Sequence, residues 1–258
     1  MSAVRDADRL ASMRIGGQLL ADLHKLLRAQ CVAGVSAATL DSLAYSFIHD
    51  HNATPSFLGY QGYKHTLCVS KNNEIVHGIP DAKKIMEPGD ICSIDAGIYY
   101  QGYHVDAART WAIDPISEPA QAVIDTAEAA FWLAMKQVRA GKPVHAIGRS
   151  IARTARQAGM ATAENLCSHG VGAALHADPL IIHERYFFSK QRLQSGMTIA
   201  VEPMIVLGSP RTVVESDKWT ISTQDGQYAA HYENTILVTD KTPEILTLDD
   251  TDSVRHNK

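Results

Sequence analysis

The chain has 258 residues, of which 45% are hydrophobic and 20% are charged, and this composition is typical of a soluble globular protein. The formal net charge is −4 and no dense run of lysine and arginine occurs, which disfavours nucleic acid or an anionic membrane surface as the main ligand. The four cysteines form no CxxC pair, so neither a cysteine zinc knuckle nor a disulfide framework is predicted.

The N-terminal residues are charged and polar and do not resemble a signal peptide. No apolar run reaches the ~18 residues that a membrane-spanning helix needs. We therefore expect a cytoplasmic protein that does not bind membranes. A monomer is expected as well, because no stripe of apolar surface residues calls for a partner chain.

Four stretches carry apolar residues at three- and four-residue steps, which predicts helices over 6–30, 36–49, 117–140 and 144–158. Ser36 is predicted to cap the second helix. Runs rich in β-branched and aromatic residues predict strands over 66–70, 91–99, 103–113, 197–207, 219–223 and 232–239. We expect a loop over 72–80 and a polar tail over 247–258, and the segment 168–179 carries two histidines.

The strands predicted over 91–99 and 103–113 are joined by Gln101 and Gly102, which is a hairpin signature. Folding this hairpin about residues 100 and 101 places Asp95 directly opposite Asp106, with their Cβ atoms roughly 5 Å apart. Two carboxylates at that distance repel each other, so we expect a metal ion or a shared proton between them. The alternative is that one aspartate is a turn or surface residue.

Features of the first half of the chain recur 107 positions later. The pairs are Gly34 and Gly141, Leu40 and Ile147, Gly89 and Gly196, and Asp95 and Glu202. This constant offset predicts a duplicated helix-helix-hairpin unit. Its two halves, about 6–113 and 114–240, are expected to pack around a pseudo-twofold axis. Asp95 and Glu202 then meet at the axis. Asp106 has no acidic counterpart at the same offset, and Glu233 is predicted to fill that position.

Two histidines flank a glycine-containing loop in the segment HGVGAALH, at 169–176. A lone histidine is more often structural than a ligand, but a pair beside a strand-borne carboxylate favours a site. The predicted ligand set is Asp95, Asp106, His169, Glu202 and Glu233. Four carboxylates and one imidazole suit two divalent ions such as Mn, Fe, Co or Zn. Shared carboxylates would hold the two ions about 3.5–4 Å apart. A water that bridges them would be acidified and become a hydroxide nucleophile.

Several motifs, in this order and near these spacings, resemble those of the type I methionine aminopeptidases of the pita-bread fold. The motifs are IVHGIP (75–80), SIDAG (93–97), HVDAART (104–110), SHGVGAALH (168–176), VEPM (201–204) and YENTILVT (232–239). The resemblance implies an α+β pita-bread fold in a single catalytic domain over 1–258. It also implies removal of the initiator methionine from nascent proteins when the second residue is small, through attack of a metal-activated hydroxide on the scissile carbonyl.

The resemblance also implies roles for the ligands. Asp95 chelates one metal, Asp106 and Glu233 bridge both, and His169 and Glu202 complete the second metal. Glu202 is in addition a candidate proton shuttle between the attacking water and the departing amine. The expected partners are peptide or nascent-protein N-termini, and contact with ribosomes is implied by the family alone.

Further residues are assigned to the substrate by the same resemblance. His77 is expected to hydrogen-bond the scissile peptide or the N-terminal amine, and His176 to polarise the carbonyl and stabilise the oxyanion. The methionine side chain is expected in an apolar slot with sulfur and aromatic surroundings, lined by Tyr60, Tyr63, Cys68, Leu175 and Trp219. A purely structural role remains open for His77, His176, Cys68 and Trp219.

The chain departs from the family pattern at Ser168 (usually glycine), Leu175 (usually phenylalanine) and Ala177 (usually an acid), and Lys64-His65 replaces a proline-containing step. We expect these positions to surround the substrate pocket and to contact no metal ligand. Two other functions stay open. A proline-specific aminopeptidase or prolidase would cleave an Xaa-Pro peptide, and a binding module that has lost its metals would purify without stoichiometric divalent ions.

Overall fold

The computed structural model describes residues 3–184 and 186–248, and the predicted polar tail lies largely outside these residues, from 249 onward. Its helices are α1 (Ala3–Gln30), α2 (Ala37–Asp50), α3 (Glu118–Met135) and α4 (His145–Gln157), with a 3₁₀ turn at Tyr60–Gly62. Ser36 caps α2 as predicted, accepting a hydrogen bond from the Thr39 N–H. Ser117 caps α3 in the same way. In the described part of the chain no helix is long and apolar enough to cross a membrane.

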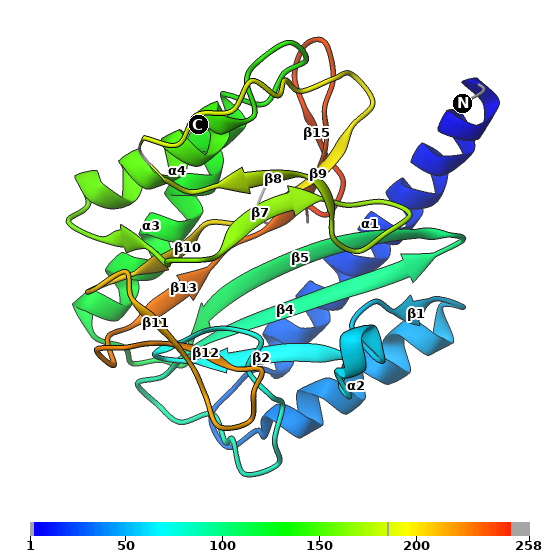
Figure 1. Ribbon diagram of the computed structural model, residues 1–258. Helices are drawn as coiled ribbons and strands as arrows, with labels where there is room; N and C mark the ends of the chain where they lie inside the picture. Colours follow the sequence, from blue (N-terminus) through cyan, green and yellow to red (C-terminus); the bar gives the residue numbers. More distant parts are fainter. Residues whose placement is uncertain (1–2, 185, 249–258) are drawn as a thin grey trace.

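The first large sheet is built around a long hairpin. Its strands are β1 (Thr54–Pro55), β2 (Leu67–Lys71), β4 (Ile91–Tyr100) and β5 (Tyr103–Ala112). Strands β1 and β2 pair with one edge of β4, and β5 pairs with the other. Helices α1 and α2 pack against this sheet (Figure 1).

The second large sheet has the order β15-β14-β9-β7-β8. Its strands are β7 (Cys167–Gly170), β8 (Ala177–Ile182), β9 (Thr198–Val201), β14 (Asn234–Leu237) and β15 (Glu244–Ile245). A small sheet beside it holds β6 (Ala161–Thr162), β10 (Met204–Val206) and β13 (Ala229–His231), and another holds β3 (Glu74–Val76), β11 (Thr212–Val214) and β12 (Ile221–Thr223). Helices α3 and α4 pack against these strands. Each half of the chain thus supplies a helix pair followed by strands, as the duplication predicted.

Strand β5 joins the two halves through the segment that runs from β13 into β14. The Thr235 hydroxyl accepts the Asp106 N–H at 2.8 Å and donates to the Asp106 carbonyl at 2.9 Å. The Thr110 hydroxyl makes the same pair of bonds with the backbone of His231, both at 2.9 Å. Between them, the Glu233 N–H donates to the Ala108 carbonyl at 2.9 Å. The two halves therefore meet along a continuous hydrogen-bonded seam.

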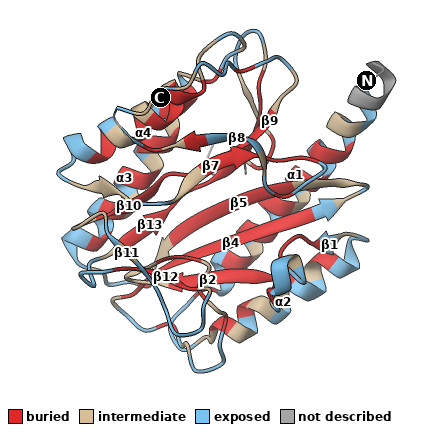
Figure 2. Ribbon diagram, in the orientation of Figure 1, coloured by how far each residue is buried: buried red, intermediate tan, exposed pale blue. Residues whose placement is uncertain are grey.

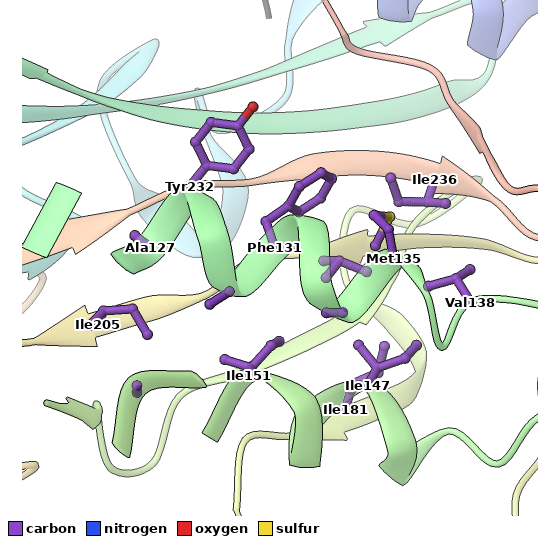
Figure 3. Close-up of a cluster of buried hydrophobic side chains, with 14 of the residues drawn as sticks. Ala127, Phe131, Met135, Val138, Ile147, Ile151, Ile181, Ile205, Tyr232 and Ile236 are labelled. Carbon is purple, nitrogen blue, oxygen red and sulfur yellow. The ribbon is translucent and has the colours of Figure 1, made fainter. Parts of the chain in front are cut away.

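Two apolar cores lie on the outer sides of this seam. One fills the space between α1, α2 and the β4–β5 hairpin, with Leu20, Leu27 and Leu40 fully buried. The other lies between α3, α4 and the strands of the second half. Figure 3 shows Phe131 in the middle of this cluster and Tyr232 at its upper edge, and their ring centroids are 5.1 Å apart. Figure 2 shows the central strands buried along most of their length, while the helices keep one exposed face.

The hairpin register differs from the prediction by two residues. Asp95 lies opposite Ala108, and Asp106 lies opposite Gly97. The reason is the turn: Gln101 and Gly102 both adopt positive φ, of 46° and 96°, so they form a two-residue loop and Tyr100 pairs with Tyr103. Because the shift is an even number of residues, both aspartates still face the same side of the sheet.

Three other elements also differ. The single strand predicted over 197–207 is two strands, β9 and β10, interrupted at Glu202-Pro203, because proline cannot donate to a ladder. The loop predicted over 72–80 contains β3, which pairs with β12 far along the chain. Helix α3 ends at Met135, five residues before the predicted end at Ala140.

Candidate active site

Four buried carboxylates meet where the two halves join. Asp95 comes from β4, Asp106 from β5, Glu202 from the turn after β9, and Glu233 from the turn between β13 and β14. None is more than 9% exposed. The two halves therefore contribute two acids each, which is the arrangement the duplication predicted.

Two groups of potential ligands share one carboxylate. Asp106, His169 and Glu233 each offer a ligand atom within 4.8 Å of the others, and so do Asp95, His231 and Glu233. Glu202 adjoins both groups, with one oxygen 3.3 Å from His169 Nε2. The five residues predicted as metal ligands are thus brought together, and His231 joins them although no role was predicted for it.

The electrostatics of the cluster favour a cation. Burial raises the pKa of the Asp106 carboxyl to about 7. Burial, with the neighbouring acids adding to it, also raises the pKa of Asp95, Glu202 and Glu233 well above the usual range. Each of the four carboxyls has one buried oxygen without a hydrogen-bond partner among the described residues. Four buried carboxyl oxygens without partners favour the binding of divalent cations. Oxygen donors together with one or two imidazoles suit Mn, Fe, Co and Zn.

The imidazole of His169 is oriented toward the carboxylates by its backbone contact. Its Nδ1 lies 2.9 Å from the Gly170 carbonyl, to which a ring N–H can donate. The proton on Nδ1 leaves the lone pair on Nε2, the atom that faces Glu202. Burial lowers the pKa of His169 to about 4, so the ring is neutral near pH 7 and able to bind a metal.

The two predicted substrate histidines line the same cavity. The His176 ring lies 4.4 Å from the His169 ring, centroid to centroid, and its Nδ1 is 2.9 Å from the Tyr60 hydroxyl. His77 has a left-handed backbone, with a φ of 59°, which is uncommon for a residue with a side chain. Burial lowers the pKa of His77 to about 4. Both rings are thus placed to hydrogen-bond a ligand in the cavity.

The cavity beside the carboxylates has a volume of about 370 Å³. Its apolar wall contains all five residues predicted for the side-chain slot: Tyr60, Tyr63, Cys68, Leu175 and Trp219. The slot adjoins the cluster because Cys68 on β2 pairs directly with Asp95 on β4. The Tyr63 and Trp219 rings meet edge to face at 5.0 Å.

The expectation that the departures from the family pattern surround the cavity is wrong for Ser168 and Ala177, and neither Lys64 nor His65 lines the cavity. Ser168 does not line the cavity but is fully buried behind it, and its hydroxyl accepts the Glu202 N–H at 2.9 Å. The same hydroxyl lies 2.8 Å from His183 Nε2. Ser168 therefore contacts the backbone of a predicted metal ligand. Leu175 does line the cavity, as expected, whereas Ala177 begins β8 outside the cavity lining.

Three functional residues were missed by sequence reasoning. Phe57 lines the apolar wall. Arg109 is buried behind Glu233, donates to its carbonyl oxygen at 2.5 Å and stacks 4.4 Å above the Tyr232 ring. His231 ends β13, two residues before Glu233. It lies outside the strand predicted over 232–239, so no sequence pattern indicated it.

Comparison with known proteins shows the family to which the chain is related. The model of metallopeptidase family M24 matches residues 11–240. The chain is 37% identical over 248 residues to a methionine aminopeptidase of Clostridium acetobutylicum, covering 96% of this chain and 99% of that protein. It is 36% identical over 250 residues to methionine aminopeptidase 1 of Mycobacterium tuberculosis, covering 95% and 94%.

Solved structures agree with the expected architecture. The crystal structure of a methionine aminopeptidase from Thermotoga maritima superposes with a TM-score of 0.91 at 34% identity, over 94% of this chain and 97% of that one. A prolidase from Pyrococcus furiosus gives a TM-score of 0.78 at 18% identity, and this chain covers 64% of its length. The second likeness is one of fold alone. The pita-bread α+β fold is confirmed.

Proposed function

This chain belongs to metallopeptidase family M24, and we propose that it is a methionine aminopeptidase, which removes the N-terminal methionine of peptides and nascent proteins. The observation that carries the proposal is a cluster of four buried carboxylates and one imidazole beside an apolar, aromatic slot. Identities of 36–37% to methionine aminopeptidases over at least 95% of the chain support it.

The five predicted ligands would hold two divalent ions. Asp95 would bind one ion, His169 and Glu202 would bind the other, and Asp106 and Glu233 would bind both. When bound, such ions supply an acidified water and polarise the scissile carbonyl. Mn, Fe, Co and Zn all accept these donors, so the availability of each metal decides which one is bound. The four carboxylates balance the charge of two divalent cations, which relieves their mutual repulsion.

The remaining steps fall to residues of the cavity. Glu202 reaches both the ligand cluster and the cavity, so it can accept a proton and pass it to the departing amine. The Tyr60 hydroxyl lies at Nδ1 of His176 and can donate to it. The proton of the ring then sits on Nε2, which can donate to the carbonyl oxygen of the substrate as negative charge develops there. His77, neutral near pH 7 because burial lowers its pKa to about 4, would hydrogen-bond the peptide or its amine.

Specificity follows from the shape of the slot. The aromatic rings of Tyr63 and Trp219 and the thiol of Cys68 form surroundings that favour a flexible thioether. We propose that only a small second residue is accepted, since a large one would crowd the rim beside the ligands. We also propose a cytoplasmic monomer with a single catalytic domain, acting on N-termini as they emerge during synthesis.

The test is release of methionine from Met-Ala-Ser by metal-free protein reloaded with Mn or Co. We expect release from this peptide, little release from Met-Trp-Ser, and no cleavage of Ala-Pro-Ala. Asp106→Asn should lower the rate by more than about 100-fold while the protein stays folded, because it removes a shared ligand. Cleavage of Ala-Pro-Ala in preference to Met-Ala-Ser would instead assign the protein to a proline-specific function.

A further inference from the structure

His231 is a buried histidine that the proposed mechanism does not use. It ends β13 and is 2% exposed. Neither of its ring nitrogens has a hydrogen-bond partner among the described residues. Leaving a buried polar group without a partner is destabilising, so a partner absent from the protein chain itself is expected to satisfy this ring.

The ring is aimed into the carboxylate cluster. His231 Nε2 lies 3.6 Å from an oxygen of Glu202 and 3.6 Å from an oxygen of Glu233. These separations are too long for hydrogen bonds. The separation from Glu233, the carboxylate proposed to be shared by both ions, does fit ligands of one ion, because two atoms that are each about 2.1 Å from a metal lie at most about 4.2 Å apart. Asp95 offers a further ligand atom within 4.8 Å of both His231 and Glu233.

The backbone holds the ring in this position. The Thr110 hydroxyl binds both the N–H and the carbonyl of His231 at 2.9 Å, and the next residue, Tyr232, is anchored against Phe131 in the core. A ring fixed by its neighbours in this way is preorganised, which is the usual condition of a metal ligand.

A second cavity beside His231 has room for the partner that a ligating histidine needs. His231 lines the active-site cavity and also a second cavity of about 610 Å³, which Arg109, Thr110 and Glu128 line as well. A histidine that binds a metal through one nitrogen donates its other N–H to a polar group or to water. The polar lining of the second cavity can supply that water.

We propose that His231 is a sixth protein ligand of the metal centre, binding through Nε2 the ion that Asp95 and Glu233 also hold. The inference rests on the proposed two-metal function. It gives each ion one imidazole, His169 for one and His231 for the other, in addition to the carboxylates. A nitrogen donor at both ions favours Co and Zn over Mn.

The experiment is proton NMR of the full chain loaded with Co(II), recorded in water. A histidine bound to Co(II) shows its remaining ring N–H as a strongly shifted, exchangeable signal. We expect two such signals in the wild type, from His169 and His231. His231→Gln should lose one of them, His169→Gln the other, and the control His145→Gln, at the start of α4 and outside the cavity, neither.

Calorimetric titration gives an independent readout. His231→Gln should weaken Co(II) binding at one of the two sites by about tenfold or more, and Mn(II) binding by less. A single shifted signal in the wild type would overturn the assignment whether or not any variant folds. So would unchanged signals and Co(II) affinities in a folded His231→Gln or His231→Asn protein. Failure of the wild type to bind Co(II) at all would overturn the proposed function too, which separates the two claims.

Discussion

Glu202 is held by a chain of neutral partners directly behind it. The Glu202 N–H donates to the Ser168 hydroxyl, which in turn lies 2.8 Å from His183 Nε2. The Ser168 N–H also points at that nitrogen, at 3.2 Å, so Nε2 is the acceptor and the serine hydroxyl is its second donor. Burial lowers the pKa of His183 to about 3, which keeps the ring neutral and able to accept. Glu202 is therefore positioned by a fixed chain of hydrogen bonds.

This arrangement predicts the effect of Ser168→Ala. Removing the hydroxyl leaves the buried Glu202 N–H without its acceptor, so the free energy of unfolding should fall by about 1–3 kcal/mol. Glu202 also loses its support, and kcat should fall more than KM rises. Urea denaturation and steady-state kinetics on Met-Ala-Ser measure both effects.

The matched control is Ser150→Ala, a buried serine of α4 that does not line the active-site cavity. It should leave kcat unchanged. If Ser168→Ala matched the wild type in both stability and kcat, the positioning role of Ser168 would be wrong.

At the level of single residues, the sequence predicts those site residues that are charged and lie inside an apolar strand. An acid inside an apolar strand, such as Asp95 or Glu202, is conspicuous because aspartate and glutamate are depleted there. Arg109, a charge inside the buried strand Tyr103–Ala112, shows the same signal, although sequence reasoning missed it. His231 shows no such signal, and its importance appears only when the fold places it beside Glu202 and Glu233.

Among the elements, the seam between β5 and the β13–β14 segment is the one on which the site depends. It joins strands more than a hundred residues apart in sequence, and its hydroxyl bridges come from Thr110 and Thr235. The seam brings Asp106 beside Glu233, since each of the two residues has its backbone tied to the other strand. The active site therefore depends on the correct docking of the two halves.

Thr235→Val tests this seam, because valine keeps the shape of the side chain but cannot accept the Asp106 N–H. The free energy of unfolding should fall by about 1–3 kcal/mol, and the affinity for the metal should fall with it. Thr212→Val, on the half-exposed strand β11, should change stability by less than about 0.5 kcal/mol. Equal stabilities of the two variants in thermal denaturation would show that the Thr235 bridge contributes nothing.

The elements themselves could largely be predicted from local patterns, but their pairing could not. Periodicity located the helices and the hairpin because each has an apolar face. The register of β4 and β5 is set by the backbone of two turn residues, which the pattern alone leaves ambiguous. The short strand β3 has only three residues, Glu74–Val76, and is a strand only because β12 pairs with it. Long-range pairing of this kind leaves no local signal.

For the whole molecule, the arrangement in two halves gives a simple reason for the position of the site. Each half has its own helix pair and its own apolar core, and the carboxylates lie between the two cores rather than in either one. Four buried acids in such a place destabilise the metal-free protein by mutual repulsion and desolvation. Divalent ions would turn this repulsion into attraction, so metal binding should stabilise the junction of the halves as well as supply the chemistry.

The most direct test of this account is methionine release from Met-Ala-Ser by metal-free protein, measured as Co(II) is added in stepwise equivalents. We predict no release without metal, a rise over the first two equivalents, a plateau after them, and reversal by a chelator. Glu233→Gln, which removes the carboxylate shared by both ligand groups, should remain inactive throughout the titration. Full release by the metal-free wild type, or activation of Glu233→Gln to the wild-type rate, would contradict it.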